Sequence, residues 1–374
     1  MNQREADVAA AFRNAIDRTI ALKPDLVVIA GDVFHNVRPT NPAILHAFAQ
    51  FSRLTQAIPD AVVVIVAGNH DTPRAAETGC ILKLFQPLGV HVVTDKAERL
   101  HFPERDLSIL AVPDTLAGRP ALTPDAAARY NVLLLHGEVE GMLPEQARSM
   151  DRASVAIPHA DIGAARWSYV ALGHYHVHRQ IAPNAYYSGS IDYTSANSWG
   201  EIGEEREAGI AGKGIIEYDM ATGEHTFHVL PVVRRWVDLR PLSARGMSAP
   251  ELDAAIASAI AQCDGGIDDC VVRLLARDVP RHIARELDQK ALRDVRRRAL
   301  HFLLDTRRPD VVRLHGHGAP GRRPSLREIV RDKLRSRLVE SDLSRDALVA
   351  LGTHYLDEVD RADTTPRAAA EGLQ

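Results

Sequence analysis

Two runs of apolar residues end abruptly in polar side chains, and the rest of the chain is organised around them. Residues 61–67 are all small or β-branched apolar residues, and they lead directly into Gly-Asn-His-Asp at 68–71. A short continuous apolar run is typical of a strand buried on both faces. Residues 26–30 repeat the design and end in Gly-Asp at 31–32. Because ligands collect at the carboxyl ends of strands in α/β sheets, we expect these polar residues at one rim.

Helical periodicity flanks the two strands. Apolar residues recur at spacings of three and four along residues 5–22, which predicts an amphipathic helix. A second helix is expected to begin near Pro42, with Thr40 or Asn41 as its N-cap, and to carry Ile44, Phe48, Phe51 and Leu54. The order helix, strand, helix, strand predicts an α/β protein in which parallel strands are joined by a crossover.

Short apolar runs then follow one another closely, and they predict a second sheet packed against the first. They lie at residues 90–94, 107–112, 131–136, 169–173, 186–190, 214–218 and 225–230. One run ends in His136, and another ends in Gly173-His174-Tyr175-His176. Alternate side chains of an extended segment share a face, so we expect His174 and His176 to point the same way.

The composition changes after residue 231, which indicates further domains. A helix at 249–262, a strand at 271–275 and a basic helical stretch at 282–304 predict a small α+β domain. A segment rich in Gly and Pro resembles a linker, and helices are expected at 325–338 and from 344 onward. The predicted divisions are residues 1–231, 232–306, 307–324 and 325–374, the last of them frayed beyond 363.

Composition and charge narrow the classes of protein. The 374 residues carry a net charge of -4, so any contact with nucleic acid must come from local patches. The three cysteines show no metal-type spacing and are expected to be reduced thiols of a cytoplasmic protein. No apolar run has membrane length, so we expect no membrane association.

Candidate metal ligands lie at the ends of the apolar runs. They are Asp32, Asn69, His136, His174 and His176. A single histidine at a strand end is usually structural, but chance does not readily place five such residues at strand ends. Oxygen and imidazole ligands suit Mn, Fe, Zn or Mg. His35 closely follows Asp32 and is a candidate for substrate contact, and Ser188 and Ser190 are expected to shape the rim.

Residues 209–214 (Gly-Ile-Ala-Gly-Lys-Gly) invite comparison with a phosphate-binding loop. They lack the glycine spacing and the Ser or Thr after the lysine that such a loop needs. We expect a simple loop that enters the strand at 214–218.

These motifs together resemble the calcineurin-type metallophosphoesterases. The resemblance rests on Gly31-Asp32, Gly68-Asn69-His70-Asp71, His136-Gly137 and Gly173-His174-x-His176, in the family's order. Within this superfamily the chain is most similar to SbcD-type DNA-repair exonuclease subunits, over residues 31–35, 38–40, 169–174 and 187–191. The resemblance covers about residues 1–230 and implies a two-sheet αββα sandwich, followed by a small capping domain and C-terminal helices.

The resemblance also implies roles for individual residues. It implies two divalent ions, manganese first, with magnesium, iron or zinc as alternatives. Asp32 would bridge the ions, and Asn69, His136 and His174 would complete one site. His176 would bind the other ion. His70 would not bind metal but would act on the leaving oxygen as general acid, or stabilise charge on the phosphate.

The sequence departs from the family at one point. The family opens with a strand that ends in Asp-x-His, and no such motif precedes Asp32 here. We therefore expect the first sheet to lack one strand and one metal site to lack two ligands. A start codon placed too far downstream, or a fragment, is the simplest explanation; a degenerate subunit that no longer cleaves is the alternative.

The C-terminal helices and a basic run point to partners. Residues 325–338 carry an apolar stripe that either packs on its own domain or docks onto a coiled coil. In the resembled family a C-terminal helical segment binds a coiled-coil ATPase of the SbcC type, and a homodimer is a further possibility. Arginines at 293 and 296–298 either contact DNA phosphates or form a solvated helix face.

The expected function is that of a metal-dependent phosphodiester hydrolase, an exonuclease or endonuclease subunit in DNA double-strand-break repair. One alternative is a phosphoesterase acting on small nucleotides or phosphoproteins. Another is a non-catalytic interaction subunit with a degenerate metal site.

Overall fold

The computed structural model describes most of the chain. The described residues are 3–73, 79–114, 120–141, 156–309, 326–336 and 344–363. They form two compact units, Met1–Pro309 and Asp310–Gln374. The four-part division expected from the sequence stays a prediction, and most of the predicted linker at 307–324 lies outside the described residues.

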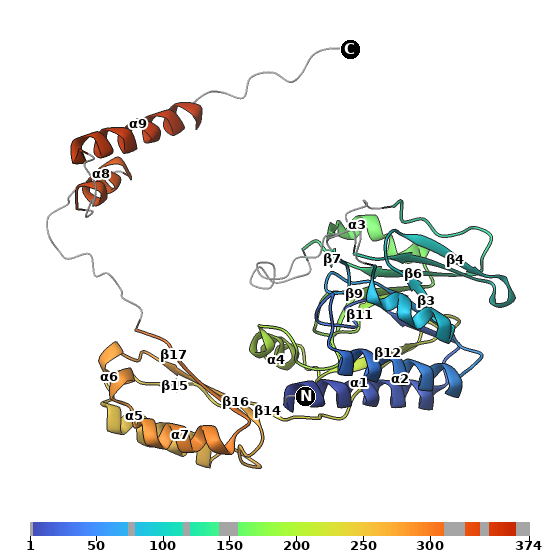
Figure 1. Cartoon of the computed structure of the whole chain (residues 1–374), viewed down its shortest axis with the longest axis horizontal. Helices are drawn as coiled ribbons and strands as arrows, with labels where there is room; N and C mark the ends of the chain where they lie inside the picture. Colours follow the sequence, from blue (N-terminus) through green and yellow to red (C-terminus); the bar gives the residue numbers. More distant parts are fainter. Residues whose placement is uncertain are drawn as a thin grey trace. The chain divides into compact units, whose positions relative to one another are not determined.

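Two sheets build the main α/β body of the first unit (Figure 1). The first sheet has parallel strands in the order β1 (Leu26–Ile29), β2 (Val62–Val66) and β3 (His91–Val93). The second has six strands in the order β10 (Arg179–Ala182), β11 (Ala185–Tyr187), β9 (Tyr169–Gly173), β6 (Tyr130–His136), β5 (Leu107–Val112) and β4 (Glu98–Phe102). β5, β6 and β9 pair in parallel. Among the described residues β1 is the first strand, and it forms one edge of its sheet.

The two sheets pack face to face through one apolar layer. Val64 and Val66 of β2 lie in one buried cluster with Ile109 of β5 and Val132 and Leu134 of β6. All five residues of β2 are buried, as its unbroken apolar run predicts. The two-sheet sandwich expected from the sequence is confirmed.

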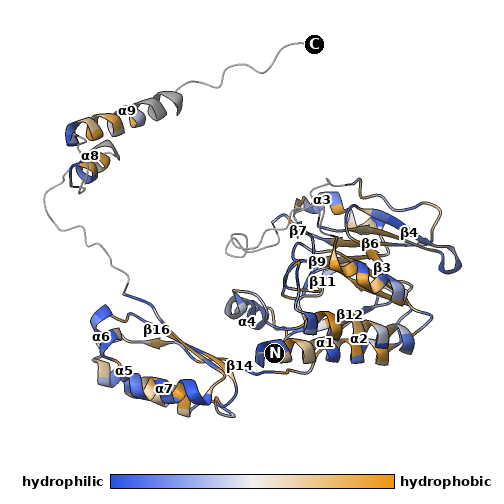
Figure 2. Ribbon diagram, viewed as in Figure 1, coloured by the Kyte–Doolittle hydropathy of each residue, from blue (hydrophilic) through white to orange (hydrophobic). Residues whose placement is uncertain are grey.

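Helices cover the outer face of the first sheet. Phe51 and Leu54 of α2 (Asn41–Ala57) and Ile16 of α1 (Gln3–Leu22) pack with Val63 and Ile65. Both helices carry hydrophobic and hydrophilic residues along their length (Figure 2). Thr40 caps α2 by accepting a hydrogen bond from the backbone N of Ala43, so this predicted N-cap is confirmed.

Short elements cover the outer face of the second sheet. Its side chains pack with Ile157 of β8 (Ala156–Ile157), Ile162 of α3 (His159–Ile162) and Trp167. β8 pairs with β7 (Glu138–Val139). Three short 3₁₀ helices also occur among the described residues: η1 (Ile81–Leu88), η2 (Pro103–Arg105) and η4 (Ala164–Arg166).

The sequence placed one strand of this region too far along the chain. The strand expected at 186–190 is β11, and it ends at Tyr187. Gly189 has φ +84°, a left-handed conformation that does not continue a strand. Helix α4 (Ser198–Glu207) and the hairpin β12 (Gly214–Tyr218) and β13 (His225–Val229) follow.

A smaller parallel sheet forms the core of residues 236–306. Its central strand, β16 (Val271–Arg277), pairs with β14 (Trp236–Asp238), β15 (Leu242–Ser243) and β17 (His301–Thr306). The helical stretch expected at 282–304 is confirmed as far as α6 (Arg281–Glu286) and α7 (Gln289–Arg298), and it is wrong beyond them, where β17 begins. Beyond α7 the apolar pattern changes to alternation, with Phe302 buried and Leu303 exposed. Helix α5 (Ala249–Ala261) also packs on this sheet.

The second unit contains two helices, α8 (Leu326–Ser336) and α9 (Arg345–Asp363), as the sequence predicts. The two helices pack closely: a Cβ at Gly352 of α9 would lie 2.5 Å from Leu334 Cδ1 of α8. No described helix combines the length and apolarity needed to cross a membrane.

A buried charge cluster ties α1 to the start of the smaller sheet. Asp7 is only 3% exposed and accepts two hydrogen bonds from Arg234, at 2.6 and 2.8 Å. Arg4 lies 3.1 Å from Asp7 and 2.9 Å from Asp192. Hydrogen bonding by Arg234, with a smaller contribution from Arg4, lowers the pKa of Asp7 against the opposing effect of burial.

This cluster makes the free energy of unfolding depend on pH. Replacing Asp7 with alanine should destabilise the protein by about 3 kcal/mol at pH 7, because Arg234, whose side chain is only 11% exposed, loses its carboxylate partner. Since the folded-state pKa lies below the ordinary value of 3.8, the contribution is present above that value and lost as the pH falls below it. Urea unfolding at pH 7 and pH 3 measures both effects. Asp17→Ala, which removes an exposed ion pair with Arg53, is the control, and equal losses from both variants would contradict the assignment.

Candidate metal centre

Strand ends bring the candidate ligands together. Asp32 follows β1, Asn69 follows β2, His136 is the last residue of β6, and His174 directly follows β9. Asp32 has φ 54° and His174 has φ 102°, backbone conformations that residues other than glycine rarely adopt. Backbone strain of this kind concentrates at functional sites, where the surrounding structure holds it in place.

Glycines allow the strand ends to approach this closely. A Cβ at Gly68 would lie 2.0 Å from Asp32 Oδ1, and one at Gly173 would lie 1.7 Å from the carbonyl oxygen of Ala30. A Cβ at Gly31 would lie 2.3 Å from His136 Nδ1. Glycine is therefore a steric requirement beside three of the candidate ligands.

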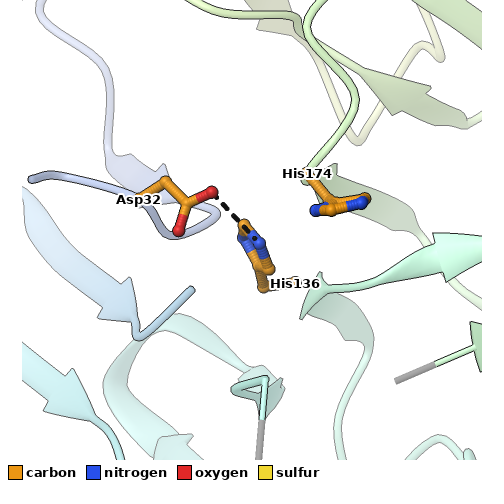
Figure 3. Close-up of side chains that lie close together, drawn as sticks. All are labelled: Asp32, His136 and His174. Carbon is orange, nitrogen blue, oxygen red and sulfur yellow. Dashed lines mark ion pairs between the residues drawn. The ribbon is translucent and has the colours of Figure 1, made fainter. Parts of the chain in front are cut away.

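Asp32, His136 and His174 converge on one point (Figure 3), with one donor atom from each within 4.8 Å of the others. His136 Nε2 lies 3.4 Å from Asp32 Oδ2 and 2.9 Å from Asn69 Oδ1. His174 Nδ1 lies 3.3 Å from the same Asn69 oxygen. Four of the five predicted ligands thus form one cluster.

The donor atoms of this cluster fit a cation. His136 is fully buried, and its Nδ1 lies 2.6 Å from the carbonyl oxygen of Ala30. A carbonyl can only accept, so Nδ1 carries the hydrogen and the neutral ring keeps its lone pair on Nε2. That lone pair faces the oxygens of Asp32 and Asn69, and a cation satisfies all three acceptors at once. A histidine ligand with its other nitrogen bound to a carbonyl is the usual arrangement at metal sites.

Asp71 fastens the two loops that carry the cluster. Its fully buried carboxylate accepts hydrogen bonds from the backbone N of Val33, Phe34 and Gly68, at 3.1 to 3.2 Å. Burial and the neighbouring charge of Asp32 raise the pKa of Asp71 to about 6. Asp71 therefore links the loop after β1 to the turn after β2.

His70 is held beside the cluster but outside it. Its backbone N donates to Asp32 Oδ1 at 3.0 Å, while its ring lies against His35 with centroids 5.2 Å apart. His70 Nδ1 bonds the carbonyl oxygen of His35 at 2.9 Å. By the same reasoning as for His136, Nδ1 carries the hydrogen and Nε2 is the nitrogen that can exchange a proton.

The structure separates His176 from the other candidate ligands. His174 has φ 102°, which departs from extended backbone, and the expectation that His174 and His176 point the same way stays a prediction. His176 is not among the described residues whose donor atoms cluster within 4.8 Å. Its Nδ1 instead lies 2.9 Å from Oε1 of Glu201 in α4.

A buried network surrounds that contact. Lys213 Nζ lies 2.7 Å from Glu201 Oε2 and 2.9 Å from Glu205 Oε1, and the second contact is an ion pair outside hydrogen-bond geometry. Burial raises the pKa of Glu201, but hydrogen bonding to His176 and the charge of Lys213 together hold it well below its usual range. The Glu201 carboxylate therefore stays charged.

The two predicted serines bond backbone atoms, and Ser190 lies beside His176. The hydroxyl of Ser190 donates to the carbonyl oxygen of Asp192 at 2.8 Å, and its backbone N donates to that of His176 at 3.0 Å. Ser188 donates to the carbonyl oxygen of Gly189 at 3.3 Å. Both hydroxyls contact backbone atoms, and their substrate-binding role stays a prediction.

Sequence reasoning missed three residues of this region. Asp71 belongs to the Gly-Asn-His-Asp motif but received no role, and Glu201 of the Glu-rich segment that forms α4 was not considered. Lys213 was assigned to a simple loop, whereas it is only 8% exposed and bonds Glu201. A lysine between two glycines, just before a strand, was the available signal.

Comparison with known proteins gives the family. A calcineurin-like phosphoesterase domain matches residues 3–191. The DNA double-strand break repair protein Mre11 of Methanocaldococcus jannaschii is 25% identical over 217 residues, 55% of this chain and 56% of that protein. The Mre11 protein of Methanococcus maripaludis is 24% identical, over 59% of each chain. A component of the nuclease SbcCD of Rhodobacter capsulatus is 26% identical over 302 residues, 68% of this chain and 70% of that protein.

These matches cover different fractions of the relatives' lengths. The chain spans little more than half the length of the two Mre11 proteins, and more of the SbcCD component. The matched domain contains every residue of the four-ligand cluster, together with His70, Asp71 and His176. The chain belongs to the calcineurin-like phosphoesterase family.

Proposed function

We propose that this protein is a metal-dependent phosphodiester hydrolase that acts on DNA, as a nuclease subunit in double-strand-break repair. The observation that carries the proposal is the convergence of Asp32, His136 and His174 within 4.8 Å, with Asn69 Oδ1 at 2.9 and 3.3 Å from nitrogens of the two histidines. The repair and nuclease names of the relatives support DNA as the substrate.

The chain's own residues would divide the work. Asp32, Asn69, His136 and His174 would hold one divalent ion, and His176 with the shared Asp32 would contribute to a second. Such ions, Mn²⁺ first, activate water for in-line attack and neutralise charge on the phosphate. His70, fixed through Nδ1, would in its imidazolium form give a proton from Nε2 to the leaving oxygen or stabilise charge there. His35, stacked on His70, would contact the substrate.

The ligand set predicts unequal metal affinities. Among the described residues, four are proposed to bind the first ion, and two, His176 and the shared Asp32, are proposed to bind the second. Two ligands rarely retain a labile divalent ion at micromolar concentration. We expect close to one tightly bound Mn²⁺ per chain, and slow hydrolysis.

The test is digestion of linear duplex DNA with Mn²⁺, beside hydrolysis of a small phosphodiester and of a phosphoprotein. Metal-dependent cleavage of DNA supports the proposal. Hydrolysis confined to the small diester or the phosphoprotein favours the general phosphoesterase, and metal binding without any hydrolysis favours the non-catalytic subunit.

The helices of the second unit are proposed to dock onto a coiled-coil ATPase of the SbcC type. Leu351 and Tyr355, one helical turn apart on α9, are 52% and 59% exposed. A helix that presents large apolar side chains to water suits helix-in-groove recognition. The name of the Rhodobacter capsulatus relative, a subunit of SbcCD, supports a multi-subunit nuclease.

Removing residues 310–374 should leave the first unit folded and abolish binding to the coiled-coil partner. Because residues 1–309 form a compact unit by themselves, the deletion should not alter their unfolding in urea. Leu351→Glu should weaken binding at least about 10-fold, because a charge replaces an apolar anchor. Ala350→Glu, at the neighbouring exposed position, is the matched control. A deletion that unfolds residues 1–309 would show that the helices belong to the first unit's core.

The cytoplasmic location and the homodimer expected from the sequence stay predictions.

A further inference from the structure

We propose that Glu201 is a positioning residue of the metal centre, which holds His176 as its Nδ1–H tautomer and so keeps the lone pair on Nε2. This inference rests on the proposed role of His176 as a metal ligand. It adds helix α4 to the elements that build the site.

The tautomer follows from what Glu201 can accept. His176 Nδ1 lies 2.9 Å from Glu201 Oε1, and a charged carboxylate has no hydrogen to give. The hydrogen of a neutral His176 ring therefore sits on Nδ1. The same tautomer is fixed at His136 by the carbonyl oxygen of Ala30, at 2.6 Å. Two proposed ligands are thus oriented alike by acceptors of different kinds.

Glu201 is itself held in place. Lys213 Nζ lies 2.7 Å from Glu201 Oε2 and 2.8 Å from the carbonyl oxygen of His176. Ser195 donates a further hydrogen bond to Glu201 Oε1. The Glu201 and Lys213 side chains are 8% and 7% exposed, so water competes little for these contacts. Lys213 therefore contacts both the backbone carbonyl of His176 and Glu201, the residue bonded to the His176 ring.

The charge of the network also suits a cation at His176. Glu201 and Glu205 lie one turn apart on α4, and both contact Lys213. Two carboxylates and one ammonium leave a surplus negative charge beside the half-buried ring. A cation beside the His176 ring is therefore favoured, since burial strengthens electrostatic attraction. A buried ion pair alone adds little stability, so orientation of His176 is the better account of this arrangement.

Nitrogen-15 NMR of the metal-free full-length protein at pH 8.5 tests the tautomer directly. The His176 signal is assigned by its loss in His176→Gln. We expect a protonated Nδ1 and an unprotonated Nε2 in the wild type, a mixture of tautomers in Glu201→Ala, and recovery of the Nδ1–H form in Glu201→Gln, whose amide oxygen still accepts. Glu207→Gln, an exposed charge change on the same helix, should match the wild type.

A titration with Mn²⁺ followed by electron paramagnetic resonance tests the consequence for metal. Glu201→Ala should lower the affinity for the second, more weakly bound Mn²⁺ about 10- to 100-fold, which is the usual effect of removing a residue that orients a ligand. The affinity for the tightly bound Mn²⁺ should not change. Because Glu201→Ala leaves Lys213 buried without its main partner and could fail to fold, Glu201→Leu/Lys213→Met removes both charges together. This double variant should stay folded and show the same mixed tautomers.

A wild-type ring protonated on Nε2, or on both nitrogens, would overturn the proposal, as would an Nδ1–H form that persists in the folded double variant. An unchanged affinity for the more weakly bound Mn²⁺ in Glu201→Ala would overturn it as well. Failure of the proposed function looks different: the wild type would cleave no DNA while its His176 tautomer was still set by Glu201.

Discussion

Replacing Asp32 with alanine is expected to abolish tight binding of Mn²⁺ and all measurable phosphodiester hydrolysis. Asp32 is the one carboxylate in the cluster, and its Oδ2 lies 3.4 Å from His136 Nε2. Without it the site offers only neutral donors, Asn69, His136 and His174. Since removing even an indirect partner of a ligand costs about 10- to 100-fold in affinity, losing this ligand should cost at least about 100-fold.

Isothermal titration with Mn²⁺ and the DNA digestion assay measure the two losses separately. The control is Asp25→Ala, whose side chain is 98% exposed and which directly precedes the same strand. Asp32 Oδ1 also accepts from the backbone N of His70, so unfolding in urea must show that the variant keeps its fold. Tight Mn²⁺ binding by folded Asp32→Ala would refute the assignment of the cluster as the metal site.

Replacing His70 with glutamine is expected to remove turnover while metal binding survives. The backbone N of His70 contacts Asp32, but its ring turns away to the carbonyl oxygen of His35. Glutamine keeps the backbone contact and cannot give up a proton. Loss of general acid catalysis typically lowers kcat by about 10² to 10⁴.

Single-turnover cleavage of duplex DNA gives the rate, and the Mn²⁺ titration gives the affinity. We expect a large fall in the rate with less than about a threefold change in metal affinity, whereas His174→Ala should lower both. If His70→Gln loses Mn²⁺ as His174→Ala does, then His70 is a ligand and not an acid.

The rim of the sheet was predictable because its signals are local. An apolar run that ends in Gly-Asp or Gly-Asn-His states both the strand and the place where it stops, and β1 and β2 form as expected. His136 was predictable for the same reason. The close approach of Gly173 to Ala30 could not be read from either segment alone, since it exists only after β9 and β1 are brought together.

Other features depend on contacts that alternation does not encode. His174 has a left-handed backbone, and His176 contacts Glu201, a residue 25 positions later in the chain. Lys213 looked like part of a loop because its partners lie on α4. In the smaller sheet the basic run of α7 obscured the alternating pattern of β17, where Phe302 is buried and Leu303 is not.

A metal site at the ends of β1, β2, β6 and β9 underlies the proposed chemistry. Anomalous diffraction from crystals grown with Mn²⁺ tests it most directly. We predict a strong anomalous peak bonded to Asp32, Asn69, His136 and His174, with a weaker second peak at His176. A data set with Mn²⁺ bound elsewhere and no peak among those four side chains would contradict this assignment.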